Sequence, residues 1–184
     1  MLETLSDSSN MAEDTEKPKL VQIAEHLERH GVEFLVIGGQ AGVLHGSPLP
    51  TFDVDLCYRR TAENLARLAE ALKALRPTLR GAPPDLPFRL DAQSLALGSN
   101  FTFNTSLGPL DLLGWVEPFG PYESLVTRAE AMDLGSCQAL VISLDDLITI
   151  KRHINRPKDQ IAAVQLEALK RMRQSEGKPD PLAS

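Results

Sequence analysis

Cysteine is scarce in this sequence, which limits the kinds of site that the chain can build. Of its 184 residues only Cys57 and Cys137 are cysteines, and neither belongs to a CxxC or Cys/His pattern of metal-ligand spacing. This usage indicates neither a structural zinc site nor a disulfide framework. A reducing compartment is then the default, and we expect a cytoplasmic protein.

Long hydrophobic runs are missing as well. No stretch approaches the roughly 18 apolar residues of a transmembrane helix, and the start of the chain lacks the charged and apolar regions of a signal peptide. We therefore expect no membrane partner. Residues 1–16 hold five acids and no Lys or Arg, so they predict a disordered acidic tail, and residues 174–184 predict a flexible tail.

Positive charge is also short overall, since the formal net charge is -6 at pH 7. Such a balance argues against an electrostatic grip on nucleic acid over the whole surface. The distribution is uneven, however, because residues 147–173 carry seven Lys or Arg against two acids. This segment offers a modest electrostatic landing site for RNA.

The hydrophobic periodicity that is present predicts one α+β domain over residues 17–173. Residues 20–27 and 62–76 have the spacing of amphipathic helices, which end at Gly31 and Pro77. Near the C-terminus, a capping pattern at Ser143 and a proline at Pro157 predict the starts of two more helices, the second running to about Arg173. The expected fold is a small mixed β-sheet with helices packed on it, followed by two C-terminal helices.

Strands are predicted where the apolar pattern is continuous or alternates. Residues 32–39 predict a buried strand, and residues 52–57 predict a second one with Phe52 on its buried face. Two further runs flank Gly108-Pro109 and predict a hairpin. Residues 77–88 include four prolines and predict a loop.

Two glycines, Gly38 and Gly39, stand between the first predicted strand and a short helix predicted for residues 40–46. Because glycine has no Cβ, the backbone here can approach a ligand closely, and amides at the helix start can receive phosphate oxygens. A tight strand-to-helix turn that needs a positive φ accounts for the same pair. The glycines alone leave both interpretations open.

The second predicted strand carries Asp53 and Asp55 in a D-x-D pattern. Side chains two residues apart on a strand leave the same face about 6.6 Å from each other. Two ionised carboxylates at that separation repel by roughly 2.5 kcal/mol at an effective dielectric of about 20. A divalent cation relieves this repulsion, and magnesium prefers carboxylate and phosphate oxygens. A solvated strand face is the ordinary alternative.

Asp111 interrupts an otherwise apolar strand of the predicted hairpin. A buried charge without a partner is costly, so this residue indicates a cation or a hydrogen-bond donor nearby. A water-exposed place at the strand end, beside Gly108-Pro109, is the alternative. Gly-Gly, D-x-D and a later single Asp are together much more specific than any one of them.

This combination resembles the DNA polymerase β-like nucleotidyltransferase superfamily. More narrowly, the chain resembles the AbiEii-type and related minimal nucleotidyltransferases, some of which are toxins of toxin-antitoxin pairs. The glycine pair, D-x-D and third carboxylate of that pattern are matched by Gly38, Gly39, Asp53, Asp55 and Asp111. The segment "SLDDLITIKRHINRPKD" is similar to the C-terminal motif of the group. The resemblance covers residues 20–170 and implies the nucleotidyltransferase fold.

The resemblance also implies an activity, the magnesium-dependent transfer of a nucleoside monophosphate from an NTP to a hydroxyl. Asp53, Asp55 and Asp111 would be the catalytic carboxylates and would hold two Mg2+ ions, with Mn2+ as an alternative. Nucleotide contacts are expected from Gly38, Gly39, Thr51, Lys151, Arg156 and Asp159, with Lys158 as a weaker candidate. For the basic residues a solvated helix face is the alternative. Asp159 would orient Lys151 or Arg156.

One departure from the pattern concerns nucleotide affinity. Related sequences commonly carry a basic residue two positions before Thr51, where this chain has Leu49. The expected acceptor is tRNA, and the protein would then act as a toxin whose partner is an antitoxin protein. An antibiotic or a protein side chain is the alternative acceptor. A catalytically inactive nucleotide-binding or partner-binding module of the same fold is the alternative from another class.

Overall fold

The computed structural model describes residues 17–83 and 88–176. The predicted acidic tail at residues 1–16 lies outside the described residues, as do residues 177–184 of the predicted C-terminal tail. Within the described ranges the chain forms a mixed α/β fold around one seven-stranded sheet, as predicted. No helix there is long and apolar enough to cross a membrane.

The strands of the sheet are β1 (Phe34–Ile37), β2 (Val54–Tyr58), β3 (Thr78–Leu79), β4 (Asn100–Thr105), β5 (Gly108–Leu113), β6 (Glu130–Asp133) and β7 (Gln138–Val141). Their order across the sheet is β3-β4-β5-β2-β1-β7-β6. β2 is parallel to β5 and β1 is parallel to β7, whereas the other neighbours are antiparallel. The strands that carry the glycine and aspartate motifs, β1 and β2, therefore lie in the interior of the sheet.

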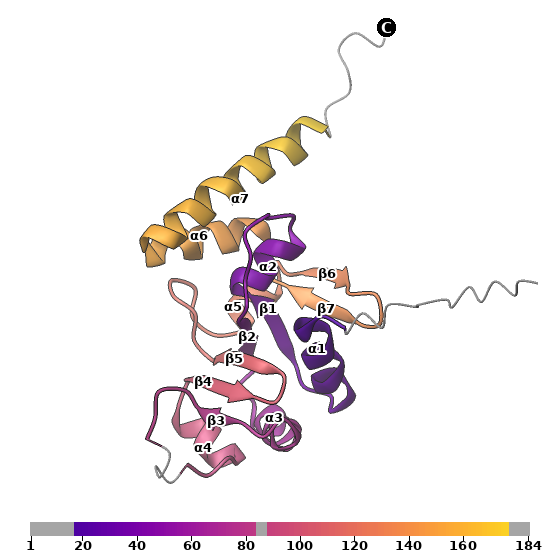
Figure 1. Ribbon diagram of the computed structural model, residues 1–184, viewed down its shortest axis with the longest axis vertical. Coiled ribbons are helices and arrows are strands. Elements are labelled where there is room, and N and C mark those ends of the chain that lie inside the picture. The colour runs from indigo at the N-terminus through magenta and orange to yellow at the C-terminus, as the bar shows by residue number, and fades with distance from the viewer. Residues whose placement is uncertain (1–16, 84–87, 177–184) are drawn as a thin grey trace, which may run out of the picture.

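The helices of the described residues are α1 (Lys19–Arg29), α2 (Gly38–Leu44), α3 (Ala62–Ala74), α4 (Ala92–Leu97), α5 (Glu123–Val126), α6 (Leu144–Ile154) and α7 (Pro157–Glu176). α6 and α7 lie at one end of the molecule and α3 and α4 at the other, with the sheet between them (Figure 1). α2 contacts β1, β2 and α6. The two C-terminal helices are thus joined to the sheet beside the D-x-D strand.

The core is built from the residues whose periodicity predicted it. Leu65, Leu68 and Leu72 of α3 are buried, and β1 is buried along its whole length. Burying one such leucine stabilises the fold by about 1.5–3 kcal/mol. The predicted cap at Ser143 is present, because its hydroxyl accepts a hydrogen bond from the Asp146 amide at 3.2 Å.

The prediction for Phe52 was wrong. Its side chain is 83% exposed and it precedes β2, which begins at Val54. The antiparallel register of β1 and β2 ends at Ile37 opposite Asp55, because the chain turns into α2 at Gly38. Residues before Val54 therefore have no β1 partner, and Phe52 has no buried face to join.

The prediction of a loop over residues 77–88 was incomplete. Thr78 and Leu79 form the edge strand β3, which pairs with Asn104 and Phe103 of β4. A two-residue strand is too short to show a periodic pattern in the sequence. It forms because the edge of β4 offers hydrogen-bond partners to its backbone groups. The predicted hairpin is present as β4 and β5, although Gly108-Pro109 lies in β5 and not in the turn.

Candidate active site

β2 and β5 place two of the predicted carboxylates side by side. Asp55 and Asp111 are register partners in this parallel pair, so their side chains leave the same face of the sheet. The alternating neighbours Val54, Leu56 and Leu110 are buried on the other face. Asp111 is thus inside the sheet, with 21% of its side chain exposed, and the strand-end alternative does not apply to it.

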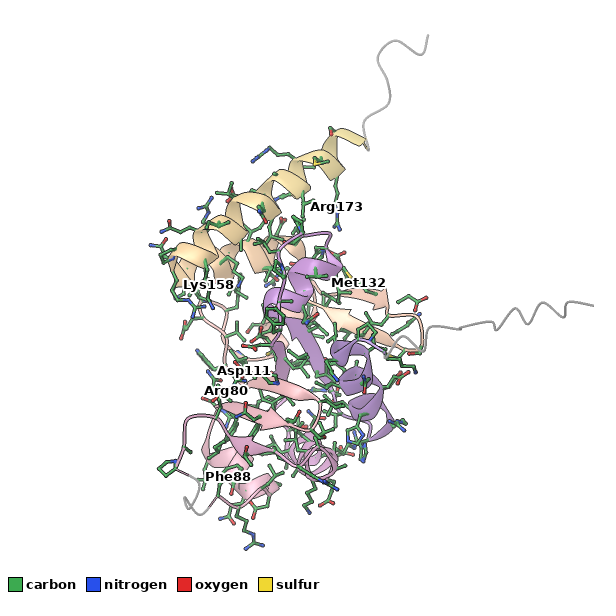
Figure 2. All side chains as sticks on the ribbon, in the orientation of Figure 1. Arg80, Phe88, Asp111, Met132, Lys158 and Arg173 are labelled. Carbon is green, nitrogen blue, oxygen red and sulfur yellow. The ribbon has the colours of Figure 1, made fainter. Side chains whose placement is uncertain are left out.

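Asp53 lies just before β2 in a bend and is 47% exposed. It is connected to Asp111 by Arg80, which directly follows β3. One guanidinium nitrogen of Arg80 lies 2.6 Å from Oδ1 of Asp111, and the other lies 3.7 Å from Oδ2 of Asp53. Figure 2 shows Arg80 and Asp111 next to each other at this part of the sheet. The D-x-D carboxylates and Asp111 therefore share one region.

Arg80 is the residue that sequence reasoning missed. It lies in the segment predicted as a proline-rich loop, and no motif around it in the sequence connects it with the aspartates. Its backbone amide donates to the carbonyl of Thr102 at 2.8 Å, and its guanidinium donates to the carbonyl of Phe103 at 3.1 Å. The pairing of β3 with β4 is what brings this cation to the site.

The glycine pair is packed against the site by contacts that only glycine permits. Gly38 has a φ of +65°, and a Cβ there would lie 2.8 Å from the Cβ of Asp55 and closer still to its carboxyl. A Cβ on Gly39 would lie 2.8 Å from the Cβ of Thr51. The predicted turn with positive φ is present, and the same turn sets the start of α2 directly against Asp55.

Thr51 bonds the loop backbone, since its hydroxyl donates to the Asp53 carbonyl at 3.4 Å. The side chain thus closes the loop just before the D-x-D pattern, where it also contacts Gly39. Leu49 is half-buried in this loop. Within the loop, the place of the missing basic residue is therefore filled by an apolar side chain.

Two of the site carboxylates, Asp55 and Asp111, are held in conditions that raise their pKa values. Burial, followed by repulsion from Asp111, raises the pKa of Asp55, against a hydrogen bond from the Gly39 backbone and the positive charge of Lys151. Burial also raises the pKa of Asp111, although the nearby Arg80 opposes this. A cation binding between these residues would relieve both effects.

The predicted nucleotide-binding residues of the C-terminal helices form a separate charged cluster. Asp159 is 1% exposed and accepts from Lys151 at 3.0 Å and from Arg156 at 2.6 Å. Burial acts to raise the pKa of Asp159, but the hydrogen bonds from Arg156 and Lys151 outweigh it and hold that pKa below its usual value. The expected pairing of Asp159 with Lys151 or Arg156 is thus present, and its role in orienting them for a nucleotide stays a prediction. Lys151 also acts electrostatically on Asp55.

The donor set at the aspartates fits a hard divalent cation. Asp53, Asp55 and Asp111 offer carboxylate oxygens only, which are the ligands that magnesium prefers. A cationic group, the Arg80 guanidinium, already lies between two of them. In residues 17–83 and 88–176 no three His, Cys, Asp or Glu side chains are gathered closely enough to hold a metal ion. The carboxylates would therefore have to draw together around a bound cation.

No protein-family profile matches the chain, and no curated protein does. Solved structures do match. The lincosamide antibiotic adenylyltransferase LnuA, solved with bound lincomycin, has a TM-score of 0.57 at 14% identity, over 84% of this chain and 98% of that one.

Two further structures are similar to the chain. A putative nucleotidyltransferase from Thermotoga maritima has a TM-score of 0.52 at 14% identity, over 85% of this chain and 91% of that one. The antibiotic-resistance factor ANT(2'')-Ia has a TM-score of 0.51 at 12% identity, over 86% and 90%. At such identities the likeness shows the fold alone. The chain has the nucleotidyltransferase fold that its sequence resemblance implied, and its placement in the AbiEii-type group stays a prediction.

Proposed function

We propose that the protein is a metal-dependent nucleotidyltransferase, which moves a nucleoside monophosphate from an NTP to a hydroxyl acceptor. The observation that supports this most directly is the register pairing of Asp55 with Asp111 on one sheet face, under the glycine turn that begins α2. Solvated strand positions would not require Gly38 to adopt a positive φ against the Asp55 carboxyl. A ligand site would explain the register pairing, the shared sheet face and the glycine turn together.

In the proposed reaction each residue has a distinct task. Asp53, Asp55 and Asp111 would hold divalent cations, expected to be Mg2+, which would neutralise the triphosphate and lower the pKa of the attacking hydroxyl. The backbone amide of Gly38 would receive the β- and γ-phosphates, joined by that of Gly39 once its hydrogen bond to the Asp55 carboxyl is released. The hydroxyl oxygen forms a bond to the α-phosphorus, its proton passes to Asp111, and the bond to the leaving pyrophosphate breaks.

The cationic cluster would supply fixed positive charge to the phosphates. Lys151 is 16% exposed and is held by the buried Asp159, so its ammonium group is ordered before a nucleotide arrives. An ordered charge stabilises phosphate negative charge at a lower entropic cost than a mobile one. We propose Lys151 as the main contact and Arg156 as a secondary one, with Thr51 maintaining the loop.

For the acceptor we favour a small hydroxyl-bearing molecule over tRNA. Two of the similar structures are an antibiotic adenylyltransferase and an antibiotic-resistance factor. Of the seven basic residues that suggested an RNA landing site, Lys151 and Arg156 are assigned above to the nucleotide, and Arg152 and Lys170 are in ion pairs with Glu167 and Asp145. This reduces the positive charge that the segment offers to the phosphates of a nucleic acid.

An assay with α-labelled nucleotides tests both parts of the proposal. Purified protein, Mg2+ and each of the four NTPs would be incubated with an antibiotic panel, total tRNA or protein substrates, with Asp55→Asn as the inactive control. Label on a small molecule supports the whole proposal. Label on tRNA supports the chemistry and overturns the acceptor. In that case expression should arrest growth, Asp55→Ala should abolish the arrest, and an antitoxin partner would be sought.

The alternative without turnover is distinguished by calorimetry. A nucleotide-binding module would bind an NTP in Mg2+ but release no pyrophosphate with any acceptor. Leu49 motivates this alternative, because the loop lacks the basic residue of related sequences. Pyrophosphate release that depends on Asp55 would exclude it.

A further inference from the structure

The Arg80 guanidinium occupies the space between two carboxylates that the proposed function assigns to cations. Its two terminal nitrogens reach Asp111 at 2.6 Å and Asp53 at 3.7 Å. Arg80 forms no ion pair with Asp55. The Asp55 carboxyl instead accepts a hydrogen bond from the Gly39 backbone, and the positive charge of Lys151 favours its ionised form. The three aspartates are therefore not equivalent, because one side of the group already has a cation and the other does not.

The position of Arg80 is fixed by the sheet and not only by its charge. The nitrogen that contacts Asp111 also donates to the Phe103 carbonyl at 3.1 Å, and the Arg80 amide donates to the Thr102 carbonyl at 2.8 Å. The Nε atom is buried and has no hydrogen-bond partner within the described residues. The guanidinium thus has a backbone anchor that does not depend on the carboxylates.

The charge at the site matches one added divalent cation. Three ionised aspartates carry three negative charges, and Arg80 neutralises one of them, which leaves two. A guanidinium is a permanent cation in proteins and presents its donors in a rigid plane, so it can hold a carboxylate in a fixed orientation. Asp111 has such a partner, whereas Asp53 and Asp55 together retain the charge that a single Mg2+ would neutralise.

Resting on the proposed nucleotidyltransferase function, we propose that Arg80 is a built-in substitute for one of the two metal ions. The site then binds one divalent cation, held by Asp53 and Asp55, and Arg80 positions Asp111 and neutralises its side of the site. Arg80 is a positioning residue in this scheme. The scheme also replaces the two-ion expectation that the sequence resemblance carried.

Counting bound Mn2+ by electron paramagnetic resonance tests this inference without any turnover. The full chain would be titrated with Mn2+ in the presence of a non-hydrolysable α,β-methylene nucleotide. We expect one ion per wild-type chain and two per Arg80→Ala chain. Arg80→Gln keeps a planar donor for the Phe103 carbonyl and should also bind two, which covers the case in which Arg80→Ala does not fold.

Two further variants show whether the gain belongs to this site. Arg80→Ala combined with Asp111→Asn should return the count to one, because the second ion would need Asp111. Arg59→Ala is the matched control, since Arg59 also joins two carboxylates, Glu33 at 2.9 Å and Glu123 at 3.2 Å, away from the aspartates. It should leave the count at one.

Several outcomes overturn the inference. Two ions in the wild type would show that Arg80 moves aside for metal, and one ion in both Arg80 variants would show that it does not set the count. An equal gain in Arg59→Ala would make the effect non-specific. One ion in the wild type still supports the proposed function in the last two cases, whereas no bound ion in any protein contradicts the metal site itself and the inference with it.

Discussion

The molecule contains two charged clusters that are built in opposite ways. On one face of the sheet, one arginine, Arg80, is shared by Asp53 and Asp111 beside a third carboxylate. Between α6 and α7, two cations surround a single carboxylate, Asp159, which is 1% exposed. The first cluster has an excess of carboxylates and the second an excess of cations.

The first cluster can therefore bind a further cation, and the second can offer positive charge to an anion. The pKa of Asp55 is raised by burial and by Asp111, so the first cluster is under strain until a cation arrives. The pKa of Asp159 is lowered by Arg156 and Lys151 despite its burial, so the second cluster is already satisfied. A metal-bound triphosphate needs both, since its metal binds carboxylates and its phosphates bind fixed cations.

We expect the largest effect from a substitution in the first cluster, at Asp55. Asp55→Asn should lower the rate of nucleotidyl transfer by on the order of 10³-fold or more, because it weakens the binding of the divalent cation that would neutralise negative charge in the transition state. The same variant should be more stable by about 1 kcal/mol at neutral pH, since a strained functional charge is lost. Steady-state kinetics and thermal unfolding measure the two effects.

A control for this prediction is Asp145→Asn, which alters an exposed aspartate of α6 paired with Lys170. It should leave the rate unchanged and should not stabilise the protein, because losing an exposed ion pair costs about 0–1 kcal/mol. An Asp55→Asn protein that is less stable than wild type would contradict the picture of a strained carboxylate.

The next effect concerns the glycine turn. Gly38→Ala should destabilise the fold by about 1–2 kcal/mol for its left-handed backbone, and by a further ~1 kcal/mol or more for the contact with Asp55. Gly135→Ala is matched, because Gly135 has a φ of +92° with nothing within 4 Å of an added Cβ. Chemical unfolding compares the two, and equal losses would show that the packing against Asp55 is unimportant.

Breaking the second cluster should have a somewhat smaller effect. Asp159→Asn removes the charge between Lys151 and Arg156 and should destabilise the protein by about 1–3 kcal/mol, as expected for a buried charged hydrogen-bonding group. It should also raise the KM for the nucleotide, because Lys151 loses its fixed position. Glu167→Gln, which breaks the exposed pair with Arg152, should cost less than about 1 kcal/mol.

The smallest expected effect is a difference between the two clusters in how they respond to pH. Because the pKa values of Asp55 and Asp111 are raised, both carboxyls take up protons at a pH above the usual aspartate pKa of about 3.9. Mn2+ binding should therefore begin to weaken while the pH is still above that value. Asp159 has a lowered pKa in the folded state, so its stabilisation is complete above about 3.9 and is lost only as the pH falls further. Mn2+ titrations and thermal unfolding between acid and neutral pH should therefore show metal affinity falling before this stabilising contribution does.

Much of the fold could be predicted because its signals are local. The helices that became α1, α3, α6 and α7 follow from apolar spacing with Gly, Pro or Ser at their ends, and the β4-β5 hairpin follows from two adjacent apolar runs. Phe52 was misplaced because alternation alone does not reveal where a partner strand stops. Its β1 partner ends at Ile37, opposite Asp55.

The candidate site was predictable in part for the same reason. Asp53, Asp55 and the glycines stand close together in the sequence, and Asp159 lies within reach of Lys151 along two consecutive helices. Arg80 could not be found this way, because it meets Asp111 only through the pairing of β3 with β4 and of β4 with β5. A residue that enters a site across a sheet leaves no spacing pattern.

Both the proposed function and the role of Arg80 require that the aspartate cluster binds a nucleotide through a divalent cation. Calorimetric titration of each NTP into wild type and Asp55→Asn, in Mg2+ and again in EDTA, tests it most directly. We expect at least one NTP to bind the wild type in Mg2+, and we expect that binding to be lost in EDTA and in Asp55→Asn. Binding that persists unchanged without the metal, or in Asp55→Asn, would contradict it.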